Sequence, residues 1–422
     1  MTSEIKQRIE QIRRGEVPER YVKTALGLAP TDWKRYTFGD IYTERKEPGD
    51  ENLPLLMVSI HSGVSDGEVD AAELPKQVKR IEDKSQYKKA VSGDLVFNMM
   101  RAWQGAIGTV RTTGMVSPAY IVAEPNDKAY PLFMDYYSRT PQMINQIDRQ
   151  SYGVTDFRKR LYWDSFAPIS CTLPPIEEQQ KIATILTTQD RVIELKEKRL
   201  AEKQRQKKYL MQQLLTGKKR LPGFSGEWKN IKLCEVLSER KEKNVEQNLR
   251  ICSVAVQKGV VDQVEHLGRS YAANDTSNYS VAHYGDIIYT KSPTGDFLYG
   301  IVKQNLLQET VAVSPLYGVF TPLTFGLGYF LHTYFQSAIC ARNYLLPIVQ
   351  KGAKNTINIT NDTFISSKLY LPLDVEEQKA IADTFIAADR EIELLRQDIR
   401  QEKQKKKALM QLLLTGIVRV KT

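Results

Sequence analysis

Cysteine and histidine are scarce in this chain, with four of each among 422 residues. Neither set contains residues at the short spacings that structural zinc sites use, so a zinc site is not expected. The cysteines are predicted to be reduced, structural thiols, and we expect neither a metal nor a disulfide framework. These residues are Cys171, Cys234, Cys252, Cys340, His61, His266, His283 and His332.

Long apolar runs are also missing. No stretch approaches the roughly twenty residues that a membrane-spanning helix needs. The N-terminus, MTSEIKQRIEQIRRG, is charged, whereas a signal peptide has an apolar region. Hydrophobic residues make up 41% of the chain and charged residues 26%, which is typical of a soluble protein, and the length is sufficient for two domains. We expect a cytoplasmic protein with no membrane segment.

The motifs of nucleotide-binding enzymes are absent from the sequence. It contains no GxxxxGK[ST] loop and no strand–GxGxxG–helix unit. Gly326 and Gly328 form a glycine pair, but they open an aromatic, helix-like stretch with no acidic residue at a useful distance. We therefore expect no cofactor and no catalytic activity in this chain.

Two short motifs that are similar to parts of active sites occur once in each half. Residues 117–120 and 314–317 have the pattern S-P-x-Y, but they lack the second proline of the S-P-P-Y motif of amino-methyltransferases. Glu-x-Lys triplets at 44–46 and 239–241 are similar to nuclease metal sites, but no aspartate lies at suitable spacing. We interpret the first motif as a structural turn and the second as a charged strand end.

Basic residues outnumber acidic ones, with 60 Lys and Arg against 50 Asp and Glu, for a net charge of +10. This excess indicates an acidic partner, with nucleic acid as the first candidate. Much of the excess lies on predicted helices, where a solvated face is the default explanation. Charge alone therefore leaves the partner open.

The main organising feature is a long predicted helix that occurs twice. Residues 177–217 and 376–416 align without a gap at an offset of 199, with 19 of 41 positions identical. Each segment begins with acidic residues, which the helix dipole favours there, and ends in Leu-Leu-Thr-Gly, where the glycine suits a left-handed C-cap. A period near 200 residues predicts two domain-sized units, each closed by one helix.

Apolar residues in both segments recur at three- and four-residue spacing, which predicts amphipathic helices. Each helix would be about 60 Å long, too long for one small domain to cover. We therefore expect the two helices to pack on each other, antiparallel, although Gln189, Lys196 and Lys203 interrupt the apolar face. Two separate domain-capping helices are the alternative. The expected helix-pair interface comprises Ile182, Leu186, Ile193, Leu200, Leu210, Leu214, Ile381, Phe385, Ile392, Ile399, Leu409 and Leu413.

The segments that precede each helix also repeat. The pairs DWKRYTFGDIYTERKE and EWKNIKLCEVLSERKE, GDLVF and GDIIY, and VSPAY and VSPLY occur in the same order. We predict an α+β fold in which two β-rich domains are joined by two long helices that form an antiparallel coiled coil, with a pseudo-twofold internal repeat. The expected division is an N-terminal helical segment at 1–30, β-rich domains at 31–172 and 223–370, and helical segments at 173–222 and 371–422.

The N-terminus contains a weaker copy of the end of the repeat. The segment IEQIRRGEVP is similar to MQQLLTGKKRLP, and the first fifteen residues are predicted to form a short helix. We therefore expect a circular organisation, in which the N-terminus supplies the piece that follows the second long helix.

Several of these segments together resemble the specificity subunit of type I restriction–modification systems. They are LPPIEEQQKI, LPLDVEEQKAI, the helix ends LMQQLLTG and LMQLLLTG, the linker KKRLPGFSGEWK and the segment RAWQGAIG. The resemblance covers nearly the whole chain. It implies a non-catalytic subunit with two target-recognition domains, each recognising one half of a bipartite double-stranded DNA site.

The same resemblance implies the partners. The two helices would set the spacer between the half-sites and dock methyltransferase subunits, two of them, which methylate adenine at N6. Restriction and translocase subunits would complete the complex. A coiled-coil adaptor with two protein-binding domains is the alternative function. Neither the half-site sequences, nor the spacer length, nor the presence of a restriction subunit follows from the sequence.

Candidate DNA-binding residues are basic, amide or hydroxyl side chains on glycine-bounded loops beside aromatic residues, since such groups contact phosphates and base edges. An ordinary solvated loop is the alternative for each, and Trp103 is also a candidate for the core. The candidates are Arg101, Trp103, Gln104, Tyr152, Arg158, Lys159 and Arg160 in the first half, and Lys291, Thr294, Lys351, Lys354 and Asn355 in the second.

Overall fold

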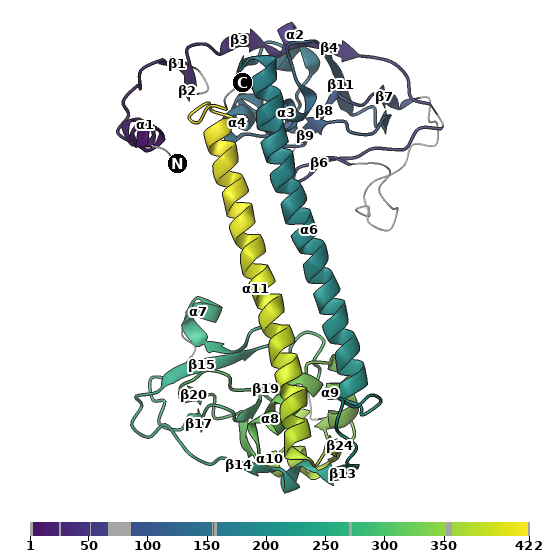
Figure 1. Ribbon diagram of the computed structural model, residues 1–422, viewed down its shortest axis with the longest axis vertical. Coiled ribbons are helices and arrows are strands. Elements are labelled where there is room, and N and C mark those ends of the chain that lie inside the picture. Colours follow the sequence, from purple (N-terminus) through teal and green to yellow (C-terminus); the bar gives the residue numbers. More distant parts are fainter. Residues whose placement is uncertain are drawn as a thin grey trace. The chain divides into compact units, whose positions relative to one another are not determined.

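The computed structural model describes residues 3–24, 27–50, 52–65, 86–153, 155, 158–269, 272–351 and 357–420. The chain divides into two compact units, Met1–Lys196 with Asp398–Thr422, and Glu197–Gln397. The long helices α6 (Ile176–Leu214) and α11 (Val375–Leu413) each contribute residues to both units (Figure 1). None of the helices in the described part of the chain has an apolar stretch long enough to span a bilayer.

The first unit contains a four-stranded antiparallel sheet in the order β4-β11-β8-β9, together with smaller strand pairs. Its strands are β1 (Tyr21–Thr24), β2 (Gly27–Pro30), β3 (Lys34–Thr37), β4 (Tyr42–Arg45), β5 (Val58–Ser59), β6 (Gly63–Val64), β7 (Lys88–Ala90), β8 (Leu95–Asn98), β9 (Ile107–Thr109), β10 (Gly114–Val116), β11 (Tyr120–Pro125) and β12 (Ser170–Leu173). Its shorter helices are α1 (Ser3–Arg13), α2 (Phe38–Ile41), η2 (Ala102–Gln104), α3 (Pro131–Tyr137), α4 (Pro141–Gln150) and α5 (Trp163–Phe166).

The second unit repeats this sheet in the order β14-β21-β18-β19 and adds a sheet in the order β16-β15-β20-β17. Its strands are β13 (Trp228–Lys232), β14 (Leu237–Glu239), β15 (Arg250–Ala255), β16 (Gly259–Asp262), β17 (Ser280–Ala282), β18 (Ile287–Tyr289), β19 (Val302–Gln304), β20 (Val311–Val313), β21 (Gly318–Pro322), β22 (Gln350–Lys351), β23 (Ile357–Asn358) and β24 (Lys368–Pro372). Its shorter helices are η4 (Leu233–Glu235), α7 (Gln263–Leu267), α8 (Phe325–Tyr334), α9 (Ala338–Leu345) and α10 (Asn361–Ser366).

The equivalent order of strands in the two sheets confirms the predicted α+β fold with an internal repeat. In each unit the last strand before a long helix pairs with the strand that opens the repeat, β12 with β3 and β24 with β13. Local sequence explains several element ends. Thr140 and Thr324 cap α4 and α8 with their hydroxyl groups, and Gly217 and Gly416 follow the long helices at φ +67° and +70°.

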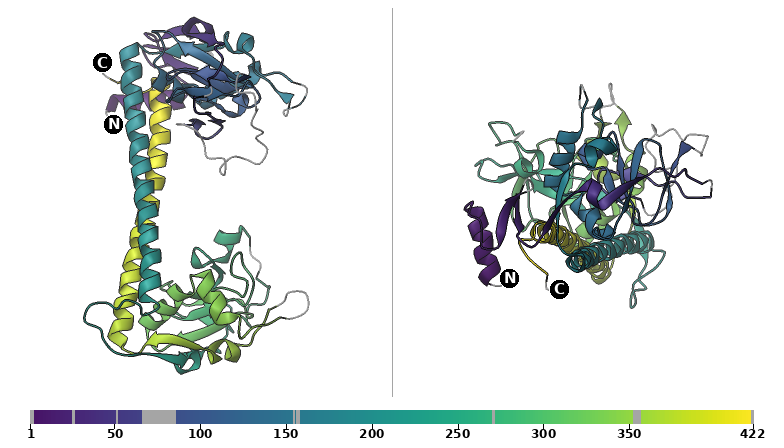
Figure 2. Two further views of the ribbon diagram at one scale, coloured as in Figure 1. Left: turned by 90° about the vertical axis from the view of Figure 1, so that its right-hand side faces the viewer. Right: turned by 90° about the horizontal axis from the view of Figure 1, so that it is seen from above.

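The ends of the long helices belong to the hydrophobic cores. In the first unit Ile182 and Leu186 of α6 join a core that also contains Leu413 of α11. In the second unit Ile381 and Phe385 of α11 join a core with the end of α6. In each unit the sheet-bearing part therefore lies against one side of the two helix segments (Figure 2).

Within the first unit, the beginning of α6 lies antiparallel to the end of α11. Gln189 Nε2 donates to Glu402 Oε2 over 2.6 Å, and Lys196 Nζ donates to Glu402 Oε1 over 2.8 Å. Lys406 forms an ion pair with Asp190. Two of the polar residues that interrupt the apolar face of α6 thus have polar partners on α11.

Within the second unit, the end of α6 pairs with the beginning of α11 in the same antiparallel sense. Lys203 Nζ lies 2.9 Å from Glu391, and Arg199 lies 3.5 Å from the same carboxylate. Lys207 forms an ion pair with Asp389. The apolar positions are buried at Ile182, Leu186, Ile193, Leu214, Ile381, Phe385, Ile392, Ile399 and Leu413, and partly exposed at Leu200, Leu210 and Leu409.

A clasp of arginine, glutamate and tryptophan joins the start of one long helix to the segment that follows the other. Arg220 binds both carboxylate oxygens of Glu377, which is 1% exposed, and lies 5.4 Å from the centroid of the Trp228 ring. The Trp228 indole N–H donates to the same carboxylate over 3.1 Å. The first unit has the corresponding Arg–Glu clasp from Arg419, Glu178 and Trp33, in which Asp32 also accepts from Arg419.

The N-terminal segment packs beside the end of α11. Arg8 donates to the carbonyl of Ile417 over 2.9 Å, and the Tyr21 hydroxyl donates to the carbonyl of Gly416 over 2.7 Å. This placement agrees with the expected circular organisation, in which the N-terminus lies at the end of the second long helix. The chain's own segment after Gly416 shares this place, because Arg419 has there the position that Arg220 has in the other unit.

Candidate nucleic-acid interface

Two loops of the first unit come together at the end of β8. The backbone N–H of Leu161 donates to the Met99 carbonyl over 2.9 Å, which joins the segment after β8 to the segment before α5. Lys159 Nζ lies 5.0 Å from the centroid of the Trp103 ring. The structure thus places two separately identified groups of candidate residues next to each other.

An exposed aromatic pair lies in this loop cluster. The rings of Tyr152 and Tyr162 are 5.8 Å apart, and the residues are 59% and 43% exposed. Tyr152 and Arg160 exchange two backbone hydrogen bonds of 3.1 and 2.9 Å, while Leu161 is fully buried. Exposed aromatic side chains beside arginines can stack on bases or contact the methyl group of thymine.

The candidate residues of this cluster differ in how free their side chains are. Arg101, Gln104 and Arg158 are exposed. Trp103 is half-buried, and its indole N–H donates to the Met100 carbonyl over 3.0 Å. Lys159 forms an ion pair with Asp148 over 2.8 Å, which offsets its charge and leaves it less suited to a phosphate contact.

Tyr162 was not among the candidates identified from the sequence. The sequence feature that could have identified Tyr162 is its position two residues after Arg160, since alternate residues of an extended segment share a face. In the structure the intervening residue, Leu161, is buried. Met100, 40% exposed, lies next to Arg101 and was also missed. Nothing in the sequence distinguishes it from a core methionine.

The candidates of the second unit are less closely gathered. Lys291 is half-buried with φ +54°, and burial lowers the pKa of its amine. Thr294 is exposed, and it pairs across a short turn with Phe297. The backbone of Lys351 forms part of the β22–β23 pair. Lys354 and Asn355 lie outside the described residues.

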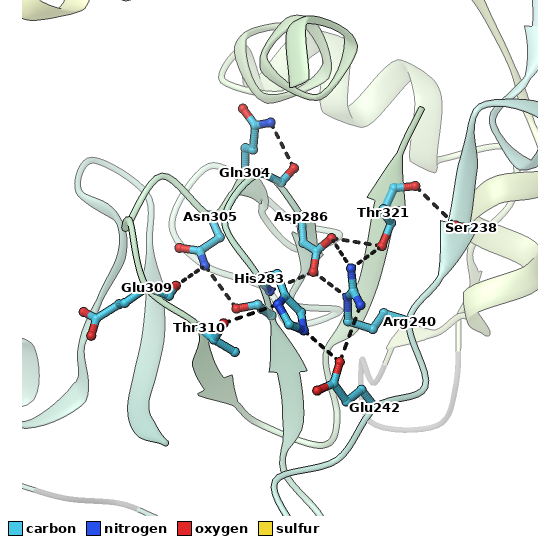
Figure 3. A network of polar contacts seen from close by, with 12 residues as sticks. Ser238, Arg240, Glu242, His283, Asp286, Gln304, Asn305, Glu309, Thr310 and Thr321 are labelled. Atoms are coloured by element: carbon cyan, nitrogen blue, oxygen red, sulfur yellow. Dashed lines mark hydrogen bonds and ion pairs between the residues drawn. The ribbon is translucent and has the colours of Figure 1, made fainter. Parts of the chain in front are cut away.

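The repeated Gly-Asp turns form structural ion pairs. Asp286 is 2% exposed, accepts from the backbone N–H of His283 over 2.8 Å, and binds Arg240 over 2.6 Å (Figure 3). Asp94 likewise accepts from Val91 N–H and from Arg45, each over 2.8 Å. The middle residue of each Glu-x-Lys triplet is therefore the arginine that neutralises a buried aspartate.

The other motif with a possible catalytic meaning is also structural. In both S-P-x-Y segments the tyrosine N–H donates to the serine carbonyl over 3.0 Å, Tyr120 to Ser117 and Tyr317 to Ser314, which is the hydrogen bond of a β-turn. Within the ranges that the structure describes, no three His, Cys, Asp or Glu side chains are arranged to hold a metal ion.

Comparison with known proteins gives concordant matches. A family model described as the type I restriction modification DNA specificity domain matches residues 71–204 and 226–403. The MjaVIII specificity subunit of Methanocaldococcus jannaschii is 24% identical over an alignment of 449 residues, which covers 96% of this chain and 97% of that protein. The HindI specificity subunit of Haemophilus influenzae is 28% identical over 174 residues, 39% of this chain and 37% of that protein.

Among solved structures, the S subunit of a type I restriction–modification system from M. genitalium has a TM-score of 0.56 to this chain. The sequence identity is 10%, and the match covers 90% of this chain and 96% of that one. At this identity the likeness concerns the fold, which the two chains share.

Proposed function

The chain belongs to the type I restriction–modification DNA specificity family, and from this premise we propose that its two sheet-bearing parts, residues 31–172 and 223–370, each recognise one half of a bipartite DNA site. One observation carries the proposal. The family model matches twice, at 71–204 and 226–403, and the two matches fall on the two copies of the internal repeat. The adaptor alternative is not favoured, because the family is one of DNA specificity subunits.

The two halves share a framework and differ in their loops. Both have the four-stranded sheet, the Gly-Asp turn with its arginine, and the Arg–Glu clasp. The loops that follow β8 and β18 carry different side chains, Arg101 and Gln104 in one and Lys291 and Thr294 in the other. A common framework with different loops suits a subunit that recognises two unrelated half-sites.

For the first half-site we propose a contact surface made of Arg101, Gln104, Tyr152, Arg158 and Arg160. The arginines supply positive charge for phosphates, and guanidinium groups also bind guanine edges with two hydrogen bonds. The tyrosine pair supplies apolar contact beside them. For the second half-site we propose Lys291, Thr294 and the loop that contains Lys351, Lys354 and Asn355.

The long helices have a separate proposed role. The helical segments 173–222 and 371–422 would fix the spacer between the half-sites and dock the partner subunits. A continuous helix of 39 residues is about 58 Å long. Half-sites recognised on one face of a duplex are separated by about 34–36 Å for each helical turn of DNA between them. Two antiparallel helices are therefore long enough to act as a spacer element.

The specificity subunits of this family are non-catalytic, so the chemistry belongs to other chains. We propose that two methyltransferase subunits, which transfer a methyl group to adenine N6, bind this chain, and that restriction and translocase subunits join the full complex. The absence of a nucleotide loop from the sequence agrees with this division of labour.

The test is selection of bound duplexes from a random-sequence library by this chain co-expressed with its methyltransferase subunits. The proposal predicts one motif of two short half-sites with a fixed gap. The triple change Arg101→Ala, Arg158→Ala and Arg160→Ala should flatten the salt dependence of binding by about 0.9 in log–log slope per lost phosphate contact. The control is Lys34→Ala, at an exposed lysine of the same unit, which should change the slope by less than the value for one phosphate contact.

Selection of no motif would overturn the assignment. An unchanged salt slope in the triple variant would remove the loop cluster from the interface and would leave the selected motif intact. The two results are therefore distinguishable.

A further inference from the structure

A cavity of about 460 Å³ lies within the second unit, beside strand β19. The end of α6 lines it with Lys207 and Lys208, and α11 lines it with Asp389, Ile392 and Arg396. Lys303 of β19 lies on its wall. An adjoining hollow of about 380 Å³ also has Lys303, Asp389 and Arg396 on its wall, so the same charged groups face both spaces.

Lys303 is a buried cation without a protein partner. It is 3% exposed, and its amine forms no hydrogen bond or ion pair with any residue in the described ranges. Burial lowers the pKa of its amine to about 8. Asp389 attracts Lys303 electrostatically, but this carboxylate already binds Lys207 and the Tyr329 hydroxyl. Buried lysines are rarely left unpaired, because desolvation of the charge is costly.

The equivalent place in the first unit is filled differently. Strand pairing of β8 with β9 and of β18 with β19 makes Gly108 the counterpart of Lys303. A Cβ atom on Gly108 would lie 3.0 Å from an oxygen of Asp135, whose carboxylate pairs with Arg111 and Arg139. The first unit therefore has a buried carboxylate at this place, bound by arginines that are 40% and 20% exposed. The second unit has the buried cation Lys303, whose attracting carboxylate, Asp389, already binds Lys207.

We propose that this cavity binds a small organic anion, a carboxylate or a phosphate with an apolar body. Lys303 meets the charge and Lys208 adds positive potential, whereas Lys207 and Arg396 are paired with Asp389 and Glu393 on the walls of the two spaces. Met211 and Phe297 on the cavity wall contact the body of the ligand. The volume lies within the range of small-molecule sites, about 300–1,000 Å³. A nearly buried amine cannot reach the backbone of a rigid duplex, so this site is distinct from DNA recognition.

Calorimetric titration of the full chain tests the site, with phenyl phosphate as the probe. We expect saturable binding at one site, at least about tenfold tighter than that of inorganic phosphate, since the ring adds apolar contact worth about 1.4 kcal/mol or more. Lys303→Met, which removes the charge and keeps an unbranched side chain only one atom shorter, should weaken binding at least about tenfold. Lys229→Met, at an exposed lysine of β13, should leave the affinity unchanged.

Two results would overturn the proposal. They are the absence of saturable phenyl phosphate binding to the unaltered chain, and equal affinity of the Lys303→Met variant. If that variant does not fold, chemical acetylation of the unaltered chain replaces it, with the modified lysines identified by mass spectrometry. Phenyl phosphate should then slow the acetylation of Lys303 and leave that of Lys229 unchanged, and failure to protect Lys303 would also refute the site.

Discussion

The clasp of the second unit should stabilise the packing of the start of α11 on β13. The variant Arg220→Met tests how large this stabilisation is. Methionine keeps an apolar stem over Trp228, but it leaves the Glu377 carboxylate, 1% exposed, without its cation. Removal of one partner from a buried ion pair costs about 3–5 kcal/mol. Arg220 itself is 25% exposed and solvent can partly replace it, so we expect a loss of about 3 kcal/mol, at the lower end of this range.

Hydrogen exchange followed by mass spectrometry gives the readout. Peptides that contain β13, whose amides pair with β24, should exchange about 150-fold faster in Arg220→Met, because 1.4 kcal/mol corresponds to a factor of ten. The repeat supplies a matched control. Arg419→Met should accelerate exchange around Trp33 in the first unit and leave β13 unchanged.

The double variant Arg220→Met with Glu377→Gln should recover most of the loss, because no charge then remains buried and the amide oxygen still accepts from Trp228. The reasoning is refuted if β13 exchange in Arg220→Met stays within about threefold of the unaltered chain. It is refuted equally if the double variant exchanges as fast as the single one.

Three further predictions follow from other parts of the structure. Tyr152→Ala with Tyr162→Ala should weaken binding to the selected site by about 1–3 kcal/mol with no change in salt slope, since tyrosines neutralise no phosphate; a smaller slope in filter-binding assays would contradict this role. The hydrogen bond from Lys196 lowers the pKa of Glu402 to about 2, so the stability that the ionised carboxylate adds is present above pH 4.5 and is lost as the pH falls towards 2. In acid titrations followed by circular dichroism, Glu402→Gln should lose less stability in that window than the unaltered chain, and an unchanged profile would count against the pair. Ile399→Lys places a charge at a position that is 7% exposed and should cost about 3 kcal/mol, or roughly 6–12 °C in Tm by thermal denaturation; an unaltered Tm would exclude tight helix packing there.

The architecture was predictable because its signals are local and repeated. The apolar period and the terminal glycines placed the helices at 177–217 and 376–416, and the structure has them at Ile176–Leu214 and Val375–Leu413. Both glycines adopt the left-handed conformation expected of a C-cap. Each of these features depends on residues a few positions apart, which is the range that sequence patterns report.

The clasps were not predictable, because their partners are far apart in the chain. Glu178 and Glu377 were interpreted as helix-start residues, for which an acidic side chain is ordinary. In the folded chain Glu178 binds Arg419, 241 residues away, and Glu377 binds Arg220, 157 residues away. The sequence shows that equivalent residues of the two repeats are 199 positions apart. This offset relates one glutamate to the other and one arginine to the other, but it does not show which glutamate binds which arginine.

The candidate interface was predictable only at the level of loops. Glycine and aromatic patterns identified the segment after β8 and the segment before α5, which lie together in the structure. Side-chain availability was not visible, because the ion pair of Lys159 with Asp148 depends on how α4 packs beside the loop. Tyr162 was missed for a related reason, since a tyrosine next to a buried leucine has the composition of a core strand.

The most direct test of the specificity assignment is genome-wide mapping of N6-methyladenine in a strain that carries the methyltransferase partner, with and without the gene for this chain. The account predicts that one bipartite motif with a fixed gap is methylated when the gene is present and unmethylated when it is deleted. Exchange of residues 223–370 for those of a relative should change one half-site and preserve the other. A set of methylated motifs that is the same with and without an intact, expressed chain would contradict the assignment.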